Sequence, residues 1–187
     1  MLWFIVFCLF LIPQTKSCPF YQNVPTNTTS TTNYTSLSTA MIAAMENNFC
    51  IVVCNNAVVF ANETLPNITS SLCVTGDTPT GSVFPYLTVE NNITSPTFFI
   101  NASNSARIVF ENLNIVNAGT LFSIVGESQL TLANMRCWFG NICVEVNSST
   151  TRALLPPGLY ADTASFMSNA IAVVNINGWV YCMHCTF

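Results

Sequence analysis

Charged side chains are scarce in this sequence. Asp, Glu, Lys and Arg make up 6% of the 187 residues, and four Lys and Arg stand against eight Asp and Glu. A protein that binds nucleic acid needs a basic patch to neutralise phosphates, and so few cations cannot assemble one. We therefore expect no nucleic-acid partner, and we expect solubility to depend on another hydrophilic group, such as a glycan.

Hydrophobic runs long enough to span a membrane are also missing. The N-terminal run Leu2–Ile12 has eleven apolar residues, whereas a transmembrane helix needs about 20. Pro13 ends the run, and Thr15 and Ser17 place small residues three positions and one position before a cleavage site at Cys18. The pattern predicts a secretory signal peptide over residues 1–17 and no transmembrane span in the mature chain.

Sequons for N-glycosylation follow the predicted signal peptide, and none has Pro at its middle position. The seven acceptors are Asn27, Asn33, Asn62, Asn67, Asn92, Asn101 and Asn147. Such a motif acquires meaning in the secretory pathway, where it marks surface positions. Together with the signal peptide, the sequons predict a heavily glycosylated protein that is secreted or displayed on the cell surface.

Cysteines are numerous, and Cys8 would leave with the signal peptide. The eight that remain are Cys18, Cys50, Cys54, Cys73, Cys137, Cys143, Cys182 and Cys185. An even number in an oxidising compartment favours disulfides, but eight cysteines allow 105 pairings. The close pairs Cys50–Cys54 and Cys182–Cys185 have spacings seen in metal sites, yet neither has a second pair at finger-like distance. We expect neither a metal nor a cofactor.

One helical pattern stands near the start of the mature chain. Before it, residues 18–35 are rich in Thr and Asn, which predicts an exposed, glycosylated lead-in without a packed core. The helix is expected over residues 36–47, with its N-cap at Thr35 or Ser36. Its apolar residues recur at helical spacing: Leu37, Ala40, Met41, Ala44 and Met45.

The rest of the chain is predicted to be all-β. Short β-branched and aromatic runs alternate with Asn, Gly, Ser and Pro. Residues 95–187 divide into four similar units, 95–117, 118–139, 140–166 and 167–187, of which the third is the longest. Each unit contains short apolar strands separated by a polar corner. Repeats of this length are typical of a solenoid, whose stacked coils share one core.

Alignment of the units predicts which residues stack on one another. Two columns are expected, one of Leu113, Met135 and Met183 and one of Ile115, Cys137, Ala164 and Cys185. In the third unit the first column would receive Asp162, a poor core residue, which indicates a register shift of one or two positions there. Asn112 and Asn134 occupy equivalent places in successive units, and their side chains are predicted to bond along a turn.

The chain resembles the right-handed parallel β-helices of the pectin-lyase-like superfamily. The resemblance lies in the Asn-x-x-Cys-x-Phe style of strand ending and in the opening Ser36-Leu37, Ala40, Ala43, followed by the strand at Cys50. A similar opening occurs in polymorphic surface proteins of bacteria and protists. The resemblance covers residues 36–187 and implies a β-helix whose first coil is capped by a short helix. The alternative is a β-sandwich with Trp138 or Trp179 in its core.

Enzymes of this superfamily cleave acidic polysaccharides with clustered Asp, or with calcium-bound acids and an Arg base. Asp77 and Asp162 would lie about 18 Å apart at a strand spacing of ~4.8 Å, whereas paired glycosidase carboxyls lie ~5–9.5 Å apart. Glu90 and Glu111 are weak catalytic candidates about one coil apart, with Arg107 on the strand of Glu111. The alternative for all three is a solvated face.

Two functions remain open. The favoured one is a non-catalytic β-helix that presents a face for adhesion or carbohydrate contact, with Tyr86, Trp138, Trp179 and Tyr181 as a sugar-stacking surface. The alternative is a polysaccharide lyase or hydrolase, or a fragment of one. The only histidine, His184, is expected to point outward without a Ser or Asp partner. Because the last strand is apolar, we expect either that coils continue beyond Phe187 or that another surface protein or a second copy covers this edge.

Overall fold

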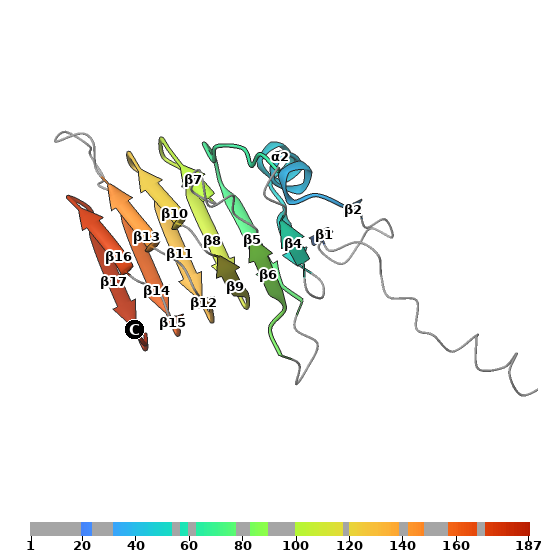
Figure 1. Ribbon diagram of the computed structural model, residues 1–187. Helices are drawn as coiled ribbons and strands as arrows, with labels where there is room; N and C mark the ends of the chain where they lie inside the picture. Colours follow the sequence, from blue (N-terminus) through green and yellow to red (C-terminus); the bar gives the residue numbers. More distant parts are fainter. Residues whose placement is uncertain are drawn as a thin grey trace, which may run out of the picture.

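The computed structural model describes residues 20–23, 32–53, 57–59, 63–77, 83–89, 100–117, 120–138, 142–147, 157–167 and 171–187. Apart from one helix, the regular structure of these residues consists of strands in three sheets (Figure 1). The all-β class predicted from the sequence is confirmed.

The three sheets are named A, B and C. Sheet A has the order β17 (Trp179–Met183), β14 (Gly158–Asp162), β11 (Gln129–Ala133), β8 (Arg107–Glu111), β5 (Leu72–Gly76), β3 (Cys50–Val53), β1 (Phe20–Asn23), β2 (Asn33–Tyr34). Sheet B has the order β15 (Ser165–Met167), β12 (Arg136–Trp138), β9 (Asn114–Asn117), β6 (Tyr86–Val89), β4 (Ala57–Val59). Sheet C has the order β16 (Ile171–Ile176), β13 (Ile142–Asn147), β10 (Thr120–Val125), β7 (Ile100–Ala102).

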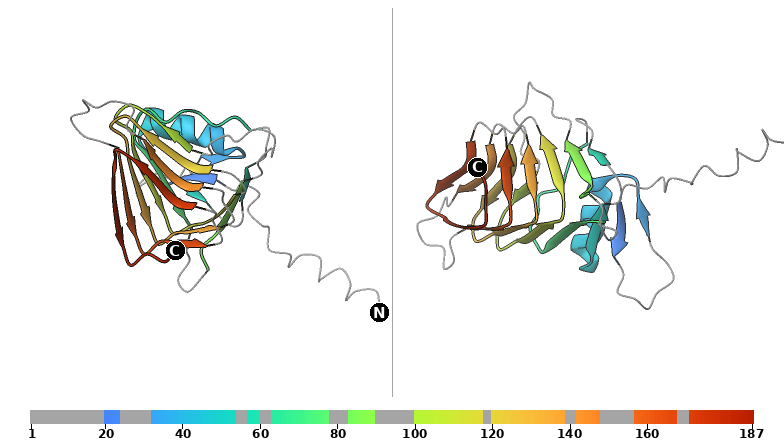
Figure 2. Two further views of the ribbon diagram at one scale, coloured as in Figure 1. Left: turned by 60° about the vertical axis from the view of Figure 1, so that its left-hand side comes forward. Right: turned by 90° about the horizontal axis from the view of Figure 1, so that it is seen from below.

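Parallel pairing dominates all three sheets. Within the described part of the chain, antiparallel pairing is confined to β1, which pairs with β2 and β3 at the N-terminal end of sheet A. From β7 onward the chain visits sheets C, A and B in turn, so that β7, β8 and β9 are followed by β10, β11 and β12. Figure 2 shows these strands on three sides of a common interior. A β-sandwich is built from antiparallel sheets, whereas stacked parallel strands fit a β-helix.

The predicted helix is present as α2 (Leu37–Asn47). The Ser36 side chain accepts a hydrogen bond from the Thr39 backbone N–H at 3.4 Å, and Asn48 ends the helix in the left-handed conformation. The residues that α2 buries are Leu37, Ala40, Met41 and Ala44. They join the core of the sheets, and Figure 1 shows α2 at one end of the stack. The sequence therefore predicted the position and buried face of this helix correctly.

A carboxylate distant in sequence completes the start of α2. Oε1 of Glu63 accepts hydrogen bonds from the Ser36 hydroxyl and from the Ser38 backbone N–H, both at 2.7 Å. The first N–H groups of a helix lack partners within the helix, and a negative charge there is favoured by the helix dipole. Glu63 thereby anchors the helix to the segment that follows β4.

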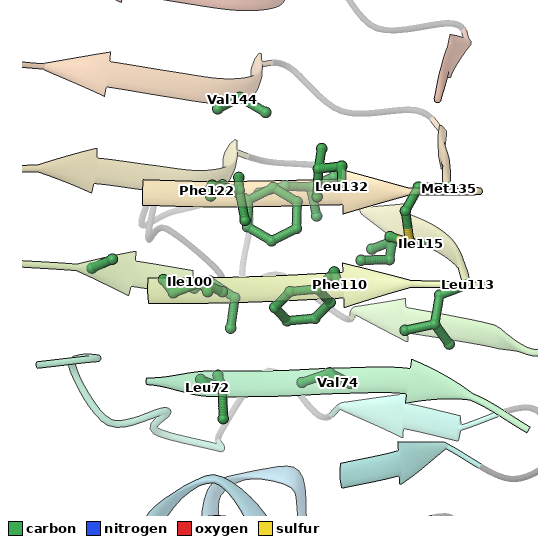
Figure 3. Packing of buried hydrophobic residues seen from close by; sticks show 14 of the residues in the cluster. Leu72, Val74, Ile100, Phe110, Leu113, Ile115, Phe122, Leu132, Met135 and Val144 are labelled. Carbon is green, nitrogen blue, oxygen red and sulfur yellow. The ribbon is translucent and has the colours of Figure 1, made fainter. Parts of the chain in front are cut away.

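Inward side chains of sheet A form columns through the core. One column is Leu72, Ile108, Leu130, Leu159 and Val180, and the next is Ile51, Val74, Phe110, Leu132, Ala161 and Cys182. Figure 3 shows Leu72, Val74, Phe110 and Leu132 beside Ile100, Phe122 and Val144 of sheet C. In the first column the residues before Val180 are 0–2% exposed, whereas Val180 is 37% exposed.

The first predicted column, of Leu113, Met135 and Met183, is correct for Leu113 and Met135 only. The register places Leu113, Met135, Ala164 and Cys185 in one column. Asp162 and Met183 pair with each other in sheet A. The assignment of Met183 to this column was therefore wrong, whereas the displacement of Asp162 agrees with the register shift predicted for the third unit. Ala164 lies two positions after Asp162, because the step from the second coil to the third is two positions longer than the alignment of the units predicted.

The second predicted column is correct for Ile115 and Cys137 and wrong for Ala164 and Cys185, for the same reason. It consists of Leu87, Ile115, Cys137 and Phe166, so that Phe166 takes the place assigned to Ala164. Phe187 stacks on Phe166 with ring centroids 5.3 Å apart, in the place assigned to Cys185. The extra residues of the third coil lie between β13 and β14 in the sequence. Every residue that the alignment misplaced comes after them.

A stack of left-handed residues turns the chain from sheet A to sheet B. Asn112, Asn134, Thr163 and His184 have φ of 57°, 51°, 53° and 52°. The Asn134 side chain donates a hydrogen bond to Oδ1 of Asn112 at 3.1 Å, as predicted. Asn tolerates this conformation better than other non-glycine residues, and a β-branched residue such as Thr163 rarely adopts it. At this corner the alternation of inward and outward side chains shifts by one.

The two ends of the stack differ. At the first end, α2 covers the core, and part of the predicted lead-in forms β1 and β2. At the last end, large apolar side chains are exposed: Met167, Ile171, Ile176, Trp179, Val180, Tyr181 and Phe187. That another surface covers these side chains stays a prediction.

Candidate functional site

A groove of about 540 Å³ lies on the outer face of sheet B near the uncovered end. Its walls come from β12, β15 and the corner residues next to them. The lining is Phe84, Asn134, Met135, Arg136, Trp138, Thr163, Ala164, Ser165, Met167, His184 and Thr186. Because the strands are parallel, equivalent outward positions of successive coils lie side by side and form a continuous wall.

The polar side of the groove follows the corner stack. Nδ1 of His184 lies 3.3 Å from Oδ1 of Asp162, and the Thr163 hydroxyl donates a hydrogen bond to the same oxygen at 3.1 Å. The Thr186 hydroxyl donates to the Ser165 hydroxyl at 2.8 Å. His184 is exposed as predicted, but the expectation that it has no Asp partner was wrong. Asp162 reaches His184 because the two residues are one coil apart.

The charge of the groove differs from that of the whole protein. The chain carries a formal net charge of −4, yet the described lining contains Arg136 and no carboxylate, and the nearest carboxylate that the contacts show, Asp162, is paired with His184. Arg136 is the exposed first residue of β12 and lines the groove. Its guanidinium can donate several hydrogen bonds in one plane, which suits a ligand rich in hydroxyl or carboxylate oxygens.

The four aromatic residues predicted to form one sugar-stacking surface lie on two faces. Trp138 lines the groove on sheet B, and Tyr86 is on β6 of the same sheet. Trp179 and Tyr181 belong to β17 of sheet A, where Tyr181 stacks on Tyr160 with ring centroids 5.4 Å apart. The groove combines Trp138 with Phe84 and Met167 instead, neither of which the sequence indicated.

The weak catalytic candidates do not meet in the described structure. Arg107 and Glu111 are the first and last residues of β8, and Arg107 donates a hydrogen bond to Oε1 of Gln129 at 3.4 Å. Glu111 pairs in register with Thr75 and Ala133. Glu90 lies outside the described residues, so that its stacking on Glu111 stays a prediction.

Another pair of carboxylates shares a register row that the sequence did not reveal. Glu111 and Asp162 both pair with Ala133, one on each side. Two strand spacings separate their backbone positions by about 9.6 Å, which is of the same order as the ~6.5–9.5 Å between the carboxyl groups of inverting glycosidases. The two residues are two coils apart in the sequence, and the long third coil hides the relation.

The described sequons lie on strands or next to them rather than in polar corners. Asn33, Asn67 and Asn101 are exposed and Asn147 is half-buried. The bridge between Ile68 and Ala102 places Asn67 beside Asn101 on neighbouring coils. The acceptors Asn27, Asn62 and Asn92 lie outside the described residues, as does the predicted signal peptide.

One disulfide joins neighbouring coils. Cys50 and Cys73 pair in register on β3 and β5, and their sulfur atoms form a disulfide. Of the other described cysteines, Cys137 and Cys143 are buried, Cys182 is exposed and Cys185 is half-buried, and Cys18 and Cys54 lie outside the described residues. Within the described part of the chain, no three His, Cys, Asp or Glu side chains gather as metal ligands.

None of the helices among the described residues has the length and hydrophobicity needed to cross a membrane. Comparison with known proteins finds no matching family model, no matching curated protein and no matching solved structure.

Proposed function

We propose that this protein is a secreted or cell-surface glycoprotein whose right-handed β-helix, of the pectin-lyase-like kind, binds carbohydrate in the groove of sheet B without cleaving it. The observation that carries the proposal is the composition of the groove. It pairs apolar surface from Trp138, Phe84 and Met167 with the Arg136 guanidinium and a row of hydroxyl and amide groups. Sugars present the same combination of apolar ring faces and hydroxyl groups.

The parallel strands support a binding role for a chain-like ligand. Equivalent outward residues repeat at about 4.8 Å from coil to coil, so that the groove wall offers similar hydrogen-bonding groups at successive positions. Asn134, Thr163 and His184 occupy one such row, and Ser165 and Thr186 occupy another. A polysaccharide lying across the coils could contact several of these positions at once.

Removal of the guanidinium is expected to weaken carbohydrate binding. A glycan array would first identify the glycans that the purified protein binds. The Kd for those glycans would then be measured by calorimetry, with the unaltered protein and with Arg136→Ala. Because a hydrogen bond to a charged group is worth about 1.5–3 kcal/mol, the Kd should rise at least about tenfold. Arg107→Ala is the matched control, since Arg107 is an exposed arginine on sheet A, and it should leave the Kd unchanged.

Two results would contradict this proposal. If Arg136→Ala and Arg107→Ala bound the glycan with the same Kd, the groove would not be the binding site. Release of new reducing ends from the bound glycan, lost in Glu111→Gln, would instead favour the alternative of a polysaccharide-cleaving enzyme that uses Glu111 and Asp162.

Glycosylation at most of the seven sequons is the test of the secretory route. The described acceptors are at least partly exposed, and an amidase that removes N-glycans should lower the apparent mass of the secreted protein by several glycans. Mass spectrometry of the treated peptides would identify each site, since the reaction converts Asn to Asp. An unchanged mass would contradict the proposed route.

A further inference from the structure

Two cysteines meet inside the core where the chain passes from sheet B to sheet C. Cys137 is the central residue of β12, and Cys143 is the second residue of β13. Both are 0% exposed and belong to the hydrophobic core that the three sheets share. The strands are consecutive, so that the cysteines flank one corner of one coil.

The two thiols are neighbours in the core. Their side chains share a hydrogen bond, and the pKa of the Cys143 thiol is raised well above its ordinary value, chiefly by burial and further by Cys137. A raised pKa reduces the thiolate, which is the form that reacts. In the folded protein this pair is therefore both shielded from reagents and chemically unreactive.

We propose that Cys137 and Cys143 are joined by a disulfide in the mature protein and that this bond forms before the coil closes. The inference rests on the secretory route proposed above, which supplies an oxidising compartment. Two S–H bonds break and one S–S bond forms. The two electrons and two protons pass to a disulfide of the compartment, a small molecule or an oxidoreductase, which becomes two thiols.

Burial sets the order of events. Exchange requires a thiolate to attack the oxidant and then a second thiolate to resolve the mixed disulfide, and neither sulfur is accessible once the core has packed. Cys182 and Cys185 provide the contrast at the uncovered end of the stack. Cys182 is exposed and Cys185 is half-buried, so that this pair can react after folding. Partial burial, together with Cys185, raises the pKa of Cys182 to about 11, which makes that reaction slow at neutral pH.

The arginines of the chain make the bond easy to detect. Trypsin cleaves after Arg136 and Arg152, which places both cysteines in the peptide 137–152. The secreted protein would be unfolded in denaturant with iodoacetamide, treated with the N-glycan amidase and digested without reduction. We expect the peptide without a label and two hydrogens lighter than the dithiol, and with two labels when reduction precedes the iodoacetamide.

Refolding separates this proposal from the secretory route. Reduced, unfolded protein would be refolded with glutathione and its disulfide, and the same peptide examined. An unlabelled peptide in this arm supports the disulfide even if the protein from cells carries no glycans, a result that would contradict only the secretory route. Two labels on the peptide from glycosylated, secreted protein would overturn the disulfide.

Alanine variants test the coupling between the two sulfurs. If they are bonded, Cys137→Ala, Cys143→Ala and the double variant should lower the midpoint of denaturation by similar amounts, because each removes the same bond. Additive losses would contradict the bond. Cys185→Ala is the control and should leave the 137–152 peptide unlabelled. Where an alanine variant does not fold, the peptide map of the unaltered protein decides the question.

Discussion

Replacing Leu113 with Asp is expected to unfold the protein. Leu113 is 0% exposed and stacks beneath Met135 in the core. An uncompensated charge at such a site costs about 3–5 kcal/mol, a large part of the roughly 5–15 kcal/mol that stabilises a typical domain. Circular dichroism and urea denaturation of the purified variant would show loss of the folded state or a midpoint near zero denaturant.

Thr131→Asp is the matched control because it introduces the same carboxylate on the outer face. Thr131 is half-buried on β11 and pairs in register with Val109 and Tyr160. A surface substitution of this kind costs about 0.5 kcal/mol or less. Equal losses at the two positions would mean that the inward and outward faces are assigned incorrectly.

Replacing Phe110 with Ala should produce the second large loss of stability. Phe110 is fully buried, and its ring meets that of Phe122 edge to face, with centroids 5.2 Å apart. Figure 3 shows the two rings between the sheets. Truncation of a buried Phe costs about 3–5 kcal/mol through lost burial and the cavity left behind. The denaturant midpoint should fall while the slope of the transition is retained.

Phe187→Ala makes the same chemical change at the uncovered end. Phe187 is 74% exposed, and its ring stacks on that of Phe166 at the edge of the core. The expected cost is that of one aromatic pair, about 0.5–1.5 kcal/mol. A loss as large as that of Phe110→Ala would show that another surface covers this end in solution.

Local patterns were sufficient where neighbouring residues decide the structure. The buried face and the N-cap of α2 depend on residues within three turns, and the sequence predicted the face and placed the N-cap at Thr35 or Ser36. The buried positions of single strands, such as Ile108 and Phe110 on β8 or Leu130 and Leu132 on β11, follow from alternation alone. The Asn112–Asn134 contact was also predictable, because the two coils that hold it have almost equal lengths.

Cysteine pairing required the register between coils. Cys50 and Cys73 have a sequence separation of 23, about one coil, but eight cysteines allow 105 pairings, and sequence spacing does not choose among them. Cys137 and Cys143 were not recognised as neighbours because a strand pattern says nothing about which corner brings two inward residues together.

The sequence by itself determined the all-β class and the single predicted helix with its buried face. These features follow from local conformational preference and from the alternation of apolar and polar residues. The tertiary structure alone decided the column partners beyond β13, the contact of Asp162 with His184 and the groove around Arg136. These features depend on hydrogen bonds between strands that are a whole coil apart in the sequence, and two extra positions in one coil change every later pairing. At each left-handed corner the alternation of inward and outward side chains also shifts by one residue, and the pattern within a single strand does not reveal this shift.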